Sequence, residues 1–245
     1  MFEGKRISLI VQARFGSTRL PGKVLEKIGG ESALKHNLYR CTKVHLIDDL
    51  CCAIPDSPVN DPIAEEAKDC GATIVRGSEN DVLSRYHKAA VHLGSDIIVR
   101  VTSDCPFLDP DVVTKTLELF LNNACTFACN NAPPTWPHGF DCEVTSFAWL
   151  DKAFTQAKDP FDREHVMPFV RNHPEIKIAN FPSDQPHLKA HRWTLDYPED
   201  LRFFQMVARY LPHPLEATTQ DILTVLHEHP EITAINAAFH ESSRK

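Results

Sequence analysis

The sequence predicts an α/β fold in which a mostly parallel sheet carries helices on both of its faces. Short β-branched runs alternate with amphipathic helical segments, and this alternation is typical of βαβ units. The run at 96–101 is almost entirely apolar, as expected for a strand that is covered on both faces. No repeat, low-complexity segment or linker divides the chain. We therefore assign residues 1–233 to one domain and residues 234–245 to a loosely held tail.

The order of the elements follows from local patterns. The first strand is expected at 7–11, where a β-branched run ends in a loop rich in Gly, Ser and Pro. Ser32 is a suitable N-cap for the helix that follows, and Gly71 and Gly94 each end a later helix. The other strands are expected at 50–54, 73–75, 96–101, 126–130, 141–145, 176–181 and 190–195. The helices are expected at 32–43, 61–70, 81–93, 111–122, 147–157, 163–172, 199–210 and 219–227.

The composition excludes several classes of protein. The 245 residues carry a formal net charge of -7, which argues against a nucleic-acid-binding protein because phosphate backbones attract a surplus of Lys and Arg. No window reaches the roughly 20 apolar residues of a membrane-spanning helix, and the first residues are charged. The eight cysteines lie mostly in apolar runs, which fits reduced thiols rather than a disulfide framework. We therefore expect a cytoplasmic protein with no nucleic-acid or membrane partner.

Polar loops follow four of the predicted strands, after Val11, Val75, Val101 and Leu195. In open parallel sheets, ligands bind outside the carboxyl ends of the strands. We therefore expect these four loops to converge on one site.

The loop at 13–23, ARFGSTRLPGK, brings three fixed cations and two glycines to the end of the first strand. Glycine lets backbone N–H groups approach phosphate oxygens, and Arg and Lys neutralise those oxygens. It is not a P-loop, because five residues separate its glycines and Val24 follows Lys23. The loop is predicted to bind a polyphosphate, with a basic surface turn as the alternative. The candidate residues are Ala13, Arg14, Gly16, Ser17, Arg19 and Lys23.

Two aspartates follow predicted strands at this edge of the sheet. Asp104 comes after the strand at 96–101, and Asp196 comes after the strand at 190–195. Mg²⁺ keeps several waters and takes one or two carboxylates besides substrate phosphates, so this pair is sufficient to bind it. The alternatives are a turn aspartate at the first position and a helix N-cap at the second. We expect Mg²⁺ as the cofactor, held by Asp104 and Asp196.

Three further residues are candidates for contact with a base or ribose. Arg76 and Ser78 lie in the polar loop after the strand at 73–75, and Arg100 lies near the end of the strand at 96–101. An Arg with nearby backbone groups can bind the edge of a pyrimidine, whereas single arginines are often solvated surface groups. Both interpretations remain open for these three residues.

A second polar cluster follows the Pro-rich loop at 132–138. Asp141 and Glu143 point to the same face of a strand, so with His138 they are candidates for binding sugar hydroxyls or a second metal. A solvent-exposed strand edge is the alternative. Arg163 and His165 stand at a charged helix start, where they either contact an acidic acceptor or belong to a capping box.

Several blocks of the sequence resemble, in order, the cytidylyltransferases that make CMP-activated acidic sugars, and especially their spore-coat polysaccharide SpsF-like relatives. The blocks are ARFGSTRLPGK at 13–23, RGSENDVLSRY at 76–86, IIVRVTSDCP at 97–106, GFDCEV at 139–144, REHV at 163–166 and TLDYPED at 194–200. They cover most of the chain. Two residues depart from the pattern, because the family often has Gly where Ser103 stands and Thr where Tyr197 stands.

The resemblance implies a GT-A-like, Rossmann-type nucleotidyltransferase fold. It implies transfer of CMP from CTP to a sugar or sugar-acid acceptor, with Mg²⁺ and release of pyrophosphate, for surface polysaccharide or glycoconjugate biosynthesis. It also implies a homodimer. By position, Asp104 and Asp196 match the family's metal carboxylates. The triphosphate loop is matched by Arg14, Ser17, Arg19 and Lys23.

Other functions of the same fold stay open. A UTP- or GTP-dependent sugar-phosphate nucleotidyltransferase is one, since related enzymes use the same fold. A nucleotide-binding module without turnover is another. A glycosyltransferase is disfavoured, because such enzymes usually carry an Asp-x-Asp motif at a strand end, where this chain has Asp104-Cys105-Pro106.

Overall fold

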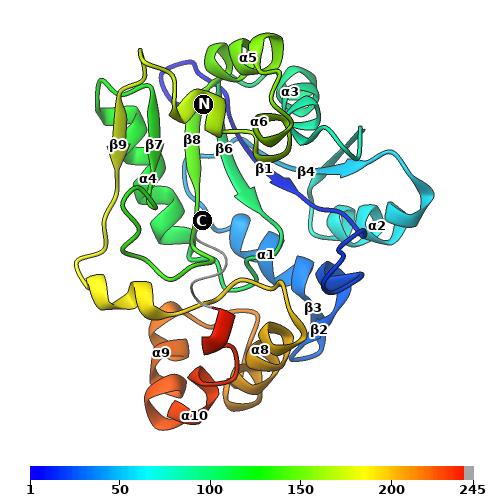
Figure 1. Cartoon of the computed structure of the whole chain (residues 1–245), viewed down its shortest axis with the longest axis vertical. Coiled ribbons are helices and arrows are strands. Elements are labelled where there is room, and N and C mark those ends of the chain that lie inside the picture. The colour runs from blue at the N-terminus through cyan, green and yellow to red at the C-terminus, as the bar shows by residue number, and fades with distance from the viewer. Residues whose placement is uncertain (240–245) are drawn as a thin grey trace.

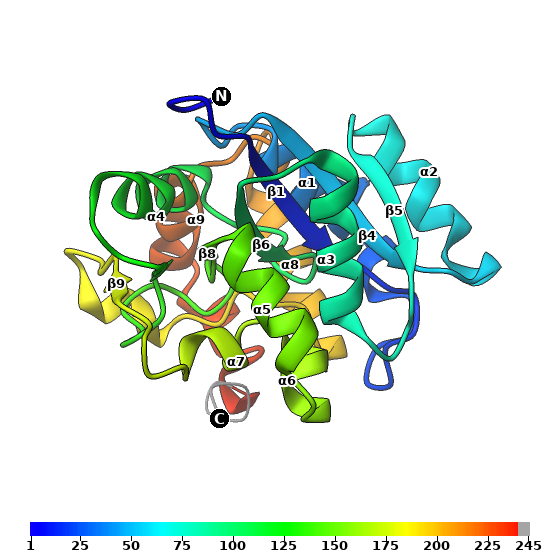
Figure 2. The ribbon, with the colours of Figure 1, turned by 90° about the horizontal axis from the view of Figure 1, so that it is seen from above.

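A central sheet with helices on both faces organises residues 1–239, which are the residues that the computed structural model describes. The described strands of this sheet lie in the order β5-β4-β1-β6-β8-β7-β9 (Figures 1 and 2). Neighbouring strands are parallel, except that β8 runs antiparallel to both β6 and β7. The prediction of a mostly parallel sheet is confirmed. The strands are β1 Ile7–Gln12, β4 Asp49–Pro55, β5 Thr73–Gly77, β6 Ile97–Thr102, β7 Phe127–Cys129, β8 Glu143–Ser146 and β9 Ile178–Asn180, with a small hairpin of β2 Lys27–Ile28 and β3 Glu31–Ser32.

The helices form two layers and one terminal group. One face of the sheet is covered by α1 Ala33–Cys41, α2 Asp61–Asp69 and α4 Pro110–Asn122. The other face is covered by α3 Val82–Leu93, α5 Phe147–Gln156 and α7 Pro168–Arg171, and α6 Pro160–His165 packs against α3 and α7. The terminal group consists of α8 Pro198–Tyr210, α9 Thr219–Glu228 and α10 Pro230–Thr233, which lie together at one end of the molecule (Figure 1).

Burial on both faces explains the apolar character of the central strands. In β1, Leu9 and Val11 pack toward α1 and α2, whereas Ile10 packs toward α3. All three side chains are fully buried. Alternate residues of a strand point to opposite faces, so a strand with two covered faces needs apolar residues at nearly every position.

Two local signals predicted helix ends correctly. Ser32 is the N-cap of α1, and its side chain accepts a hydrogen bond from the backbone N–H of Lys35. Gly94 ends α3 in the left-handed conformation, at φ 65°. Glycine adopts that conformation without the steric cost that a Cβ atom brings.

The prediction of a strand at 190–195 is wrong. A short 3₁₀ helix, Pro186–Ala190, is followed by an extended segment that makes only an isolated bridge, between Arg192 and His138, among the described residues. This segment pairs with loops rather than with the sheet: Trp193 N donates to His138 O at 2.6 Å, and Leu195 N donates to Asp104 O at 2.8 Å. In the sequence, an extended apolar run that packs against a loop looks the same as an apolar run that forms a strand, so the prediction could not separate the two.

The single helix predicted at 163–172 is also wrong, because the chain breaks it into α6 and α7. Val166 interrupts the helix with φ 72° and ψ -56°. Pro168 is the first residue of α7, a position where its missing N–H group has no helical partner to lose. The remaining predicted elements are present, with small shifts at their ends.

The described part of the predicted loose tail, 234–239, is held in place. Asn236 is buried, and Phe239 stacks on Tyr197 with ring centroids 4.1 Å apart. Residues 240–245 lie outside the described residues.

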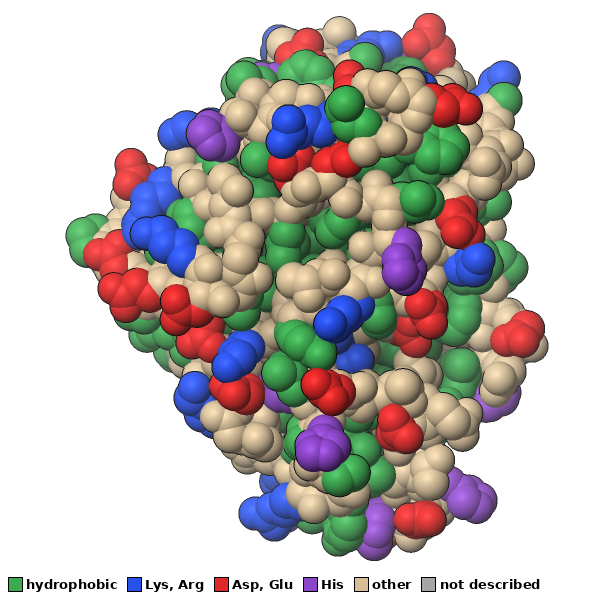
Figure 3. Space-filling model, turned by 180° about the vertical axis from the view of Figure 1, so that it is seen from behind, with side chains coloured by type: hydrophobic (Ala, Val, Ile, Leu, Met, Phe, Trp, Pro, Cys, Tyr) green, Lys and Arg blue, Asp and Glu red, His purple; other side chains and the backbone are tan. Residues whose placement is uncertain are grey.

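The distribution of charged side chains on the surface and the state of the cysteines agree with the expectations from the composition. The face shown in Figure 3 carries basic and acidic side chains interspersed among hydrophobic and uncharged ones. Within residues 1–239, no helix combines the length and the apolar character that crossing a bilayer requires. All eight cysteines are free thiols, as the sequence predicted.

Candidate active site

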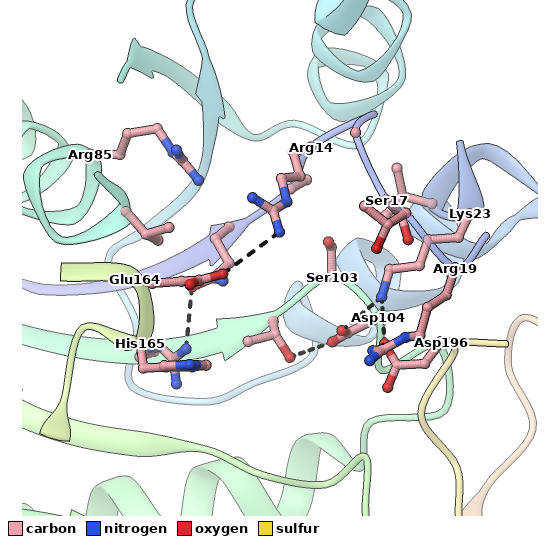
Figure 4. A pocket seen from close by; sticks show the side chains of 18 residues that line it. Arg14, Ser17, Arg19, Lys23, Arg85, Ser103, Asp104, Glu164, His165 and Asp196 are labelled. Atoms are coloured by element: carbon pink, nitrogen blue, oxygen red, sulfur yellow. Dashed lines mark hydrogen bonds and ion pairs between the residues drawn. The ribbon is translucent and has the colours of Figure 1, made fainter. Parts of the chain in front are cut away.

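The carboxyl ends of β1 and β6 open into a pocket of about 460 Å³ (Figure 4). Its wall comes from the loop after β1, the end of β6, the start of α3, the end of α6 and the turn before α8. Three of the four predicted loops therefore converge, and the loop after β5 supplies no lining residue. The predicted site residues that line the pocket are Ala13, Arg14, Gly16, Ser17, Arg19, Lys23, Arg100, Asp104 and Asp196.

The loop after β1 is folded back on itself around Phe15. The backbone N–H of Gly22 donates to Phe15 O at 3.0 Å, and Phe15 N donates to the buried Asn60 side chain at 2.9 Å. Gly22 has φ 69°, and a Cβ atom there would lie 3.2 Å from the Phe15 ring. Glycine is therefore favoured at this position, where the chain turns to place Lys23 at the pocket.

Lys23 joins the two candidate metal aspartates. Its Nζ atom lies 3.0 Å from Asp104 Oδ2 and 2.9 Å from Asp196 Oδ1 (Figure 4). The other oxygen of Asp104 accepts a hydrogen bond of 2.6 Å from the Thr102 hydroxyl. The two carboxylates, which are far apart in the sequence, thus face one cation.

Two arginines complete the surroundings of Asp196. Arg19 lies 2.9 Å from Oδ1, the oxygen that Lys23 also contacts. Arg192 donates to Oδ2 at 3.2 Å from a fully buried position. Arg19 also lies over the ring of Tyr197, with its guanidinium carbon 4.8 Å from the ring centroid.

A pair of contacts between loops explains why Asp196 lies beside Asp104. The carbonyl oxygen of Asp104 accepts hydrogen bonds from Leu195 N at 2.8 Å and from the Thr194 hydroxyl at 3.3 Å. The segment before Asp196 is therefore attached to the loop after β6. The sequence placed the two aspartates together correctly, although the strand on which the argument relied is absent.

The charges at this pair are stabilised by their mutual contacts. Burial alone would raise the pKa of Asp104, but the Lys23 ammonium and the Thr102 hydroxyl outweigh it and hold that pKa well below its usual value. Burial and the neighbouring Asp104 likewise oppose ionisation of Asp196, yet Lys23 and Arg19 lower its pKa. Burial would lower the pKa of Lys23, and the two carboxylates raise it instead. All three groups are therefore charged near neutral pH.

The donor set at this position fits a hard divalent cation. Two carboxylates already converge on one cationic group, the Lys23 ammonium, and carboxylate oxygens are the ligands that Mg²⁺ prefers. Within residues 1–239, no group of three or more His, Cys, Asp or Glu side chains is arranged to hold a metal. A site of two carboxylates suits an ion that takes its remaining ligands from substrate phosphates and water.

The other end of the pocket is bounded by α3 and α6. Arg85 is buried and donates from Nη1 to the carbonyl oxygens of Ser78 and Glu79, so it fixes the loop after β5. Glu164 and His165 line the pocket from the end of α6, and Glu164 lies 3.9 Å from Arg14 (Figure 4). His165 therefore lines the site, which agrees with the interpretation that it contacts a ligand.

Arg76 and Ser78 do not line the pocket. Arg76 forms an ion pair with Asp61 at 2.6 Å, which is typical of a surface position. Arg100 does line the pocket, but its guanidinium is held by Glu143 at 2.6 Å and by Gln12 at 3.3 Å.

In the cluster after the Pro-rich loop, Glu143 is a buried structural residue and not part of an exposed strand edge, whereas ligand contact by His138 and Asp141 stays a prediction. Glu143 is buried and binds Arg100 and Arg171 at once. Asp141 precedes β8 and accepts hydrogen bonds from Asn131 at 3.0 Å and from Gly139 N at 3.1 Å.

Arg163, for which the sequence left an acceptor contact and a capping box as alternatives, turns inward. It binds both carboxylate oxygens of Asp81, the N-cap of α3, and donates to Phe154 O at 2.8 Å. This residue therefore attaches α6 to α3, which places the neighbouring Glu164 at the pocket.

Sequence reasoning missed Arg192 and Asp200. Asp200 is fully buried and binds Arg192 through both carboxylate oxygens, each at 2.9 Å. It also accepts hydrogen bonds from the backbone N–H groups of Asp196 and Tyr197, at 2.9 and 3.0 Å. Asp200 lies three residues after the N-cap of α8, which is a position typical of helix capping. That position does not indicate an ion pair with Arg192.

The comparisons with known proteins agree with this arrangement. A family model described as cytidylyltransferase matches residues 8–209. The spore coat polysaccharide biosynthesis protein SpsF of Bacillus subtilis (strain 168) is 29% identical, over 92% of this chain and 95% of its own. A cytidylyltransferase structure from Leptospira borgpetersenii serovar Hardjo-bovis matches with a TM-score of 0.87 and 31% identity, over 94% of this chain and 97% of that chain.

A more distant structure shares the fold. A CMP:2-keto-3-deoxy-manno-octonic acid synthetase complexed with CTP matches with a TM-score of 0.66 and 17% identity, over 84% of this chain and all of that chain. The sequence blocks, the sheet order and the family model thus lead to one result. The chain belongs to the cytidylyltransferase family.

Proposed function

We propose that this protein transfers CMP from CTP to a sugar or sugar-acid acceptor and releases pyrophosphate, with Mg²⁺ as cofactor, for the synthesis of a surface polysaccharide or glycoconjugate. The observation that carries the proposal is the Asp104–Lys23–Asp196 arrangement at the end of a loop rich in cations. The family and the relatives named above support the nucleotide and the class of acceptor.

The loop after β1 provides the groups that a triphosphate needs. Arg14, Arg19 and Lys23 supply three positive charges at the pocket wall, and backbone N–H groups near Gly16 and Ser17 supply neutral donors. We assign the β- and γ-phosphates to these residues. The base and ribose are assigned to the other end of the pocket, beside Val82 and Arg85.

The reaction forms one bond and breaks one. An acceptor hydroxyl oxygen attacks the α-phosphorus in line and loses its proton to water, while the bond from the α-phosphorus to the bridging oxygen breaks and pyrophosphate leaves with the electron pair. Arg19 and Lys23 offset the charge that develops on the leaving group. Asp104 and Asp196, both ionised, would hold Mg²⁺, which supplies charge neutralisation at the α-phosphate when bound.

Pyrophosphate release tests the proposal directly. We would incubate the protein and Mg²⁺ with CTP, UTP, GTP or ATP and a panel of acidic sugars and sugar phosphates. Asp104→Asn removes one candidate ligand, and Asp111→Asn is the matched control, because Asp111 is an exposed aspartate outside the pocket.

Each result has a distinct meaning. Turnover with CTP that Asp104→Asn abolishes and Asp111→Asn preserves is the expected outcome. Turnover with UTP or GTP in its place would reassign the nucleotide. Binding of CTP without turnover across the panel would instead favour a nucleotide-binding module that lacks catalysis.

A further inference from the structure

The C-terminal segment reaches the active site through one buried amide. Asn236 follows α10 and is 2% exposed. Its Nδ2 atom donates two hydrogen bonds, to Arg192 O at 3.0 Å and to Asp200 Oδ1 at 2.9 Å. The red end of the described chain in Figure 1 lies beside α8 and α10.

Both partners of Asn236 act directly on Asp196. Arg192 donates from Nη2 to Asp196 Oδ2 at 3.2 Å, and the same guanidinium binds Asp200. Asp200 accepts the backbone N–H of Asp196 at 2.9 Å. The side chain and the backbone of Asp196 are therefore both held by groups that Asn236 contacts.

This contact orients the carboxylate of Asp196. Because Arg192 occupies Oδ2, the other oxygen is directed at Lys23 and Arg19, toward the pocket. Loss of the Asn236 amide would leave Arg192 O and one oxygen of Asp200 without a donor that they have now, and the ion pair would be free to shift. Asp196 would then lose its fixed orientation.

A second contact of the same segment reaches the neighbouring residue. Phe239 stacks on Tyr197 at an interplanar angle of 18°, and Tyr197 in turn carries the guanidinium of Arg19. If the end of the chain only had to pack against the rest of the fold, apolar contacts would be sufficient, and the fully buried Ile232 already makes them. The stacked ring meets Tyr197 directly, and the polar contact meets Arg192 and Asp200, the two residues that hold Asp196. This arrangement points to a role beyond folding.

We propose that Asn236 is a positioning residue, which orients the metal-binding carboxylate of Asp196 through Arg192 and Asp200. This inference rests on the proposed function, because it assigns Asp196 to the cation. Groups that hydrogen-bond a metal ligand, as Arg192 and Asp200 would here, commonly change metal affinity by about 10- to 100-fold when they are removed, and Asn236 acts through both of them. The segment at 234–239 thus supports the site indirectly, through Arg192 and Asp200.

The test compares Asn236→Ala with Ile235→Ala in the full chain. Ile235 is the adjacent residue, is partly buried and packs against the same apolar cluster, so its truncation weakens the segment without touching the amide. The affinity for Mn²⁺ in the presence of CTP is measured by electron paramagnetic resonance. The affinity for CTP in EDTA and the melting temperature are measured alongside it.

The expected result is an apparent Mn²⁺ dissociation constant about tenfold higher in Asn236→Ala. CTP affinity in EDTA should be unchanged, and Ile235→Ala should bind Mn²⁺ like the wild type. Wild-type Mn²⁺ affinity in Asn236→Ala, or an equal loss in both variants, would overturn this inference and leave the proposed function intact. A wild-type protein that binds no Mn²⁺ with CTP would overturn the proposed metal site and this inference together.

Discussion

The Lys23 ammonium occupies the space between Asp104 and Asp196, 3.0 Å from one carboxylate and 2.9 Å from the other. The proposed Mg²⁺ needs the same oxygens. Lys23 and the metal therefore compete for this pair unless another anion attracts the lysine away. The triphosphate of a nucleotide is such an anion, so nucleotide and metal are expected to enter together.

Metal affinity should therefore depend on the nucleotide. The wild type is expected to bind Mn²⁺ weakly alone and at least about tenfold more tightly with CTP or pyrophosphate. The metal must replace Lys23 at the carboxylates, and an interaction that shifts a pKa by one unit changes a binding constant about tenfold. Lys23→Met removes the competing charge and should bind Mn²⁺ tightly without a nucleotide. Paramagnetic resonance measures both affinities. Lys35→Met, an exposed lysine paired with Glu31, is the control. A Lys23→Met variant no better than the wild type would contradict the competition.

Stability should depend on pH differently in Lys23→Met. In the wild type the pKa of Asp104 is lowered, so its stabilising effect is present above the unfolded pKa of about 3.9 and is lost as the pH falls below it. Without Lys23, burial and the neighbouring Asp196 raise that pKa, so protonation of Asp104 favours the folded state as the pH falls.

The measurement is the free energy of unfolding in urea at pH 7 and pH 5. We expect Lys23→Met to be less stable than the wild type by about 1 to 3 kcal/mol at pH 7, the usual cost of leaving buried polar groups unpaired. The difference should narrow at pH 5. A constant difference would mean that the lysine does not control the ionisation of the pair.

The loop conformation should be sensitive at Gly22. Gly22→Ala and Gly94→Ala both place a Cβ atom in a left-handed backbone, which costs about 1 to 2 kcal/mol in each case. Only Gly22 faces another side chain, because a Cβ atom at Gly94 meets nothing within 4 Å among the described residues. Gly22→Ala should therefore weaken CTP binding several-fold in a titration, whereas Gly94→Ala should not. Equal CTP affinities would show that Phe15 does not shape the phosphate loop.

The ion pairs of Glu143 predict a large effect on stability. Glu143→Gln leaves Arg100 and Arg171 without their shared carboxylate, and breaking a buried ion pair costs about 3 kcal/mol or more. The matched control is Glu118→Gln, since Glu118 forms an exposed helical pair with Lys115 that contributes about 0.5 kcal/mol or less. Urea unfolding compares them. Equal losses would argue that Glu143 is not a structural residue.

The sheet could be predicted from the sequence because the patterns that indicate strands and helix ends involve residues close together in the chain. Apolar runs, Ser32 as an N-cap and Gly94 as a helix end depend on residues near in the chain. The same holds for the cations of the loop after β1, since the residues that form the loop are consecutive.

The errors concern contacts between distant segments. No local pattern shows that Leu195 pairs with the loop after β6 instead of with a strand, or that Glu143 is buried against Arg100. Residues 234–245, which include Asn236, were predicted to be loosely held because the last residues of a domain commonly are. The burial of Asn236 depends on the ion pair of Arg192 and Asp200, which forms only in the folded chain.

The attachment of Leu195 to Asp104 also bears on how such proteins diversify. The chain leaves the site after Asp104, builds α4 to α7 with the strands beside them, and returns through one backbone hydrogen bond to deliver Asp196. Insertions, deletions and exchanges within that excursion can therefore reshape the surface beside the reacting groups while the return point stays in register. Under the proposed function, such changes would alter the choice of acceptor without rebuilding the carboxylate pair.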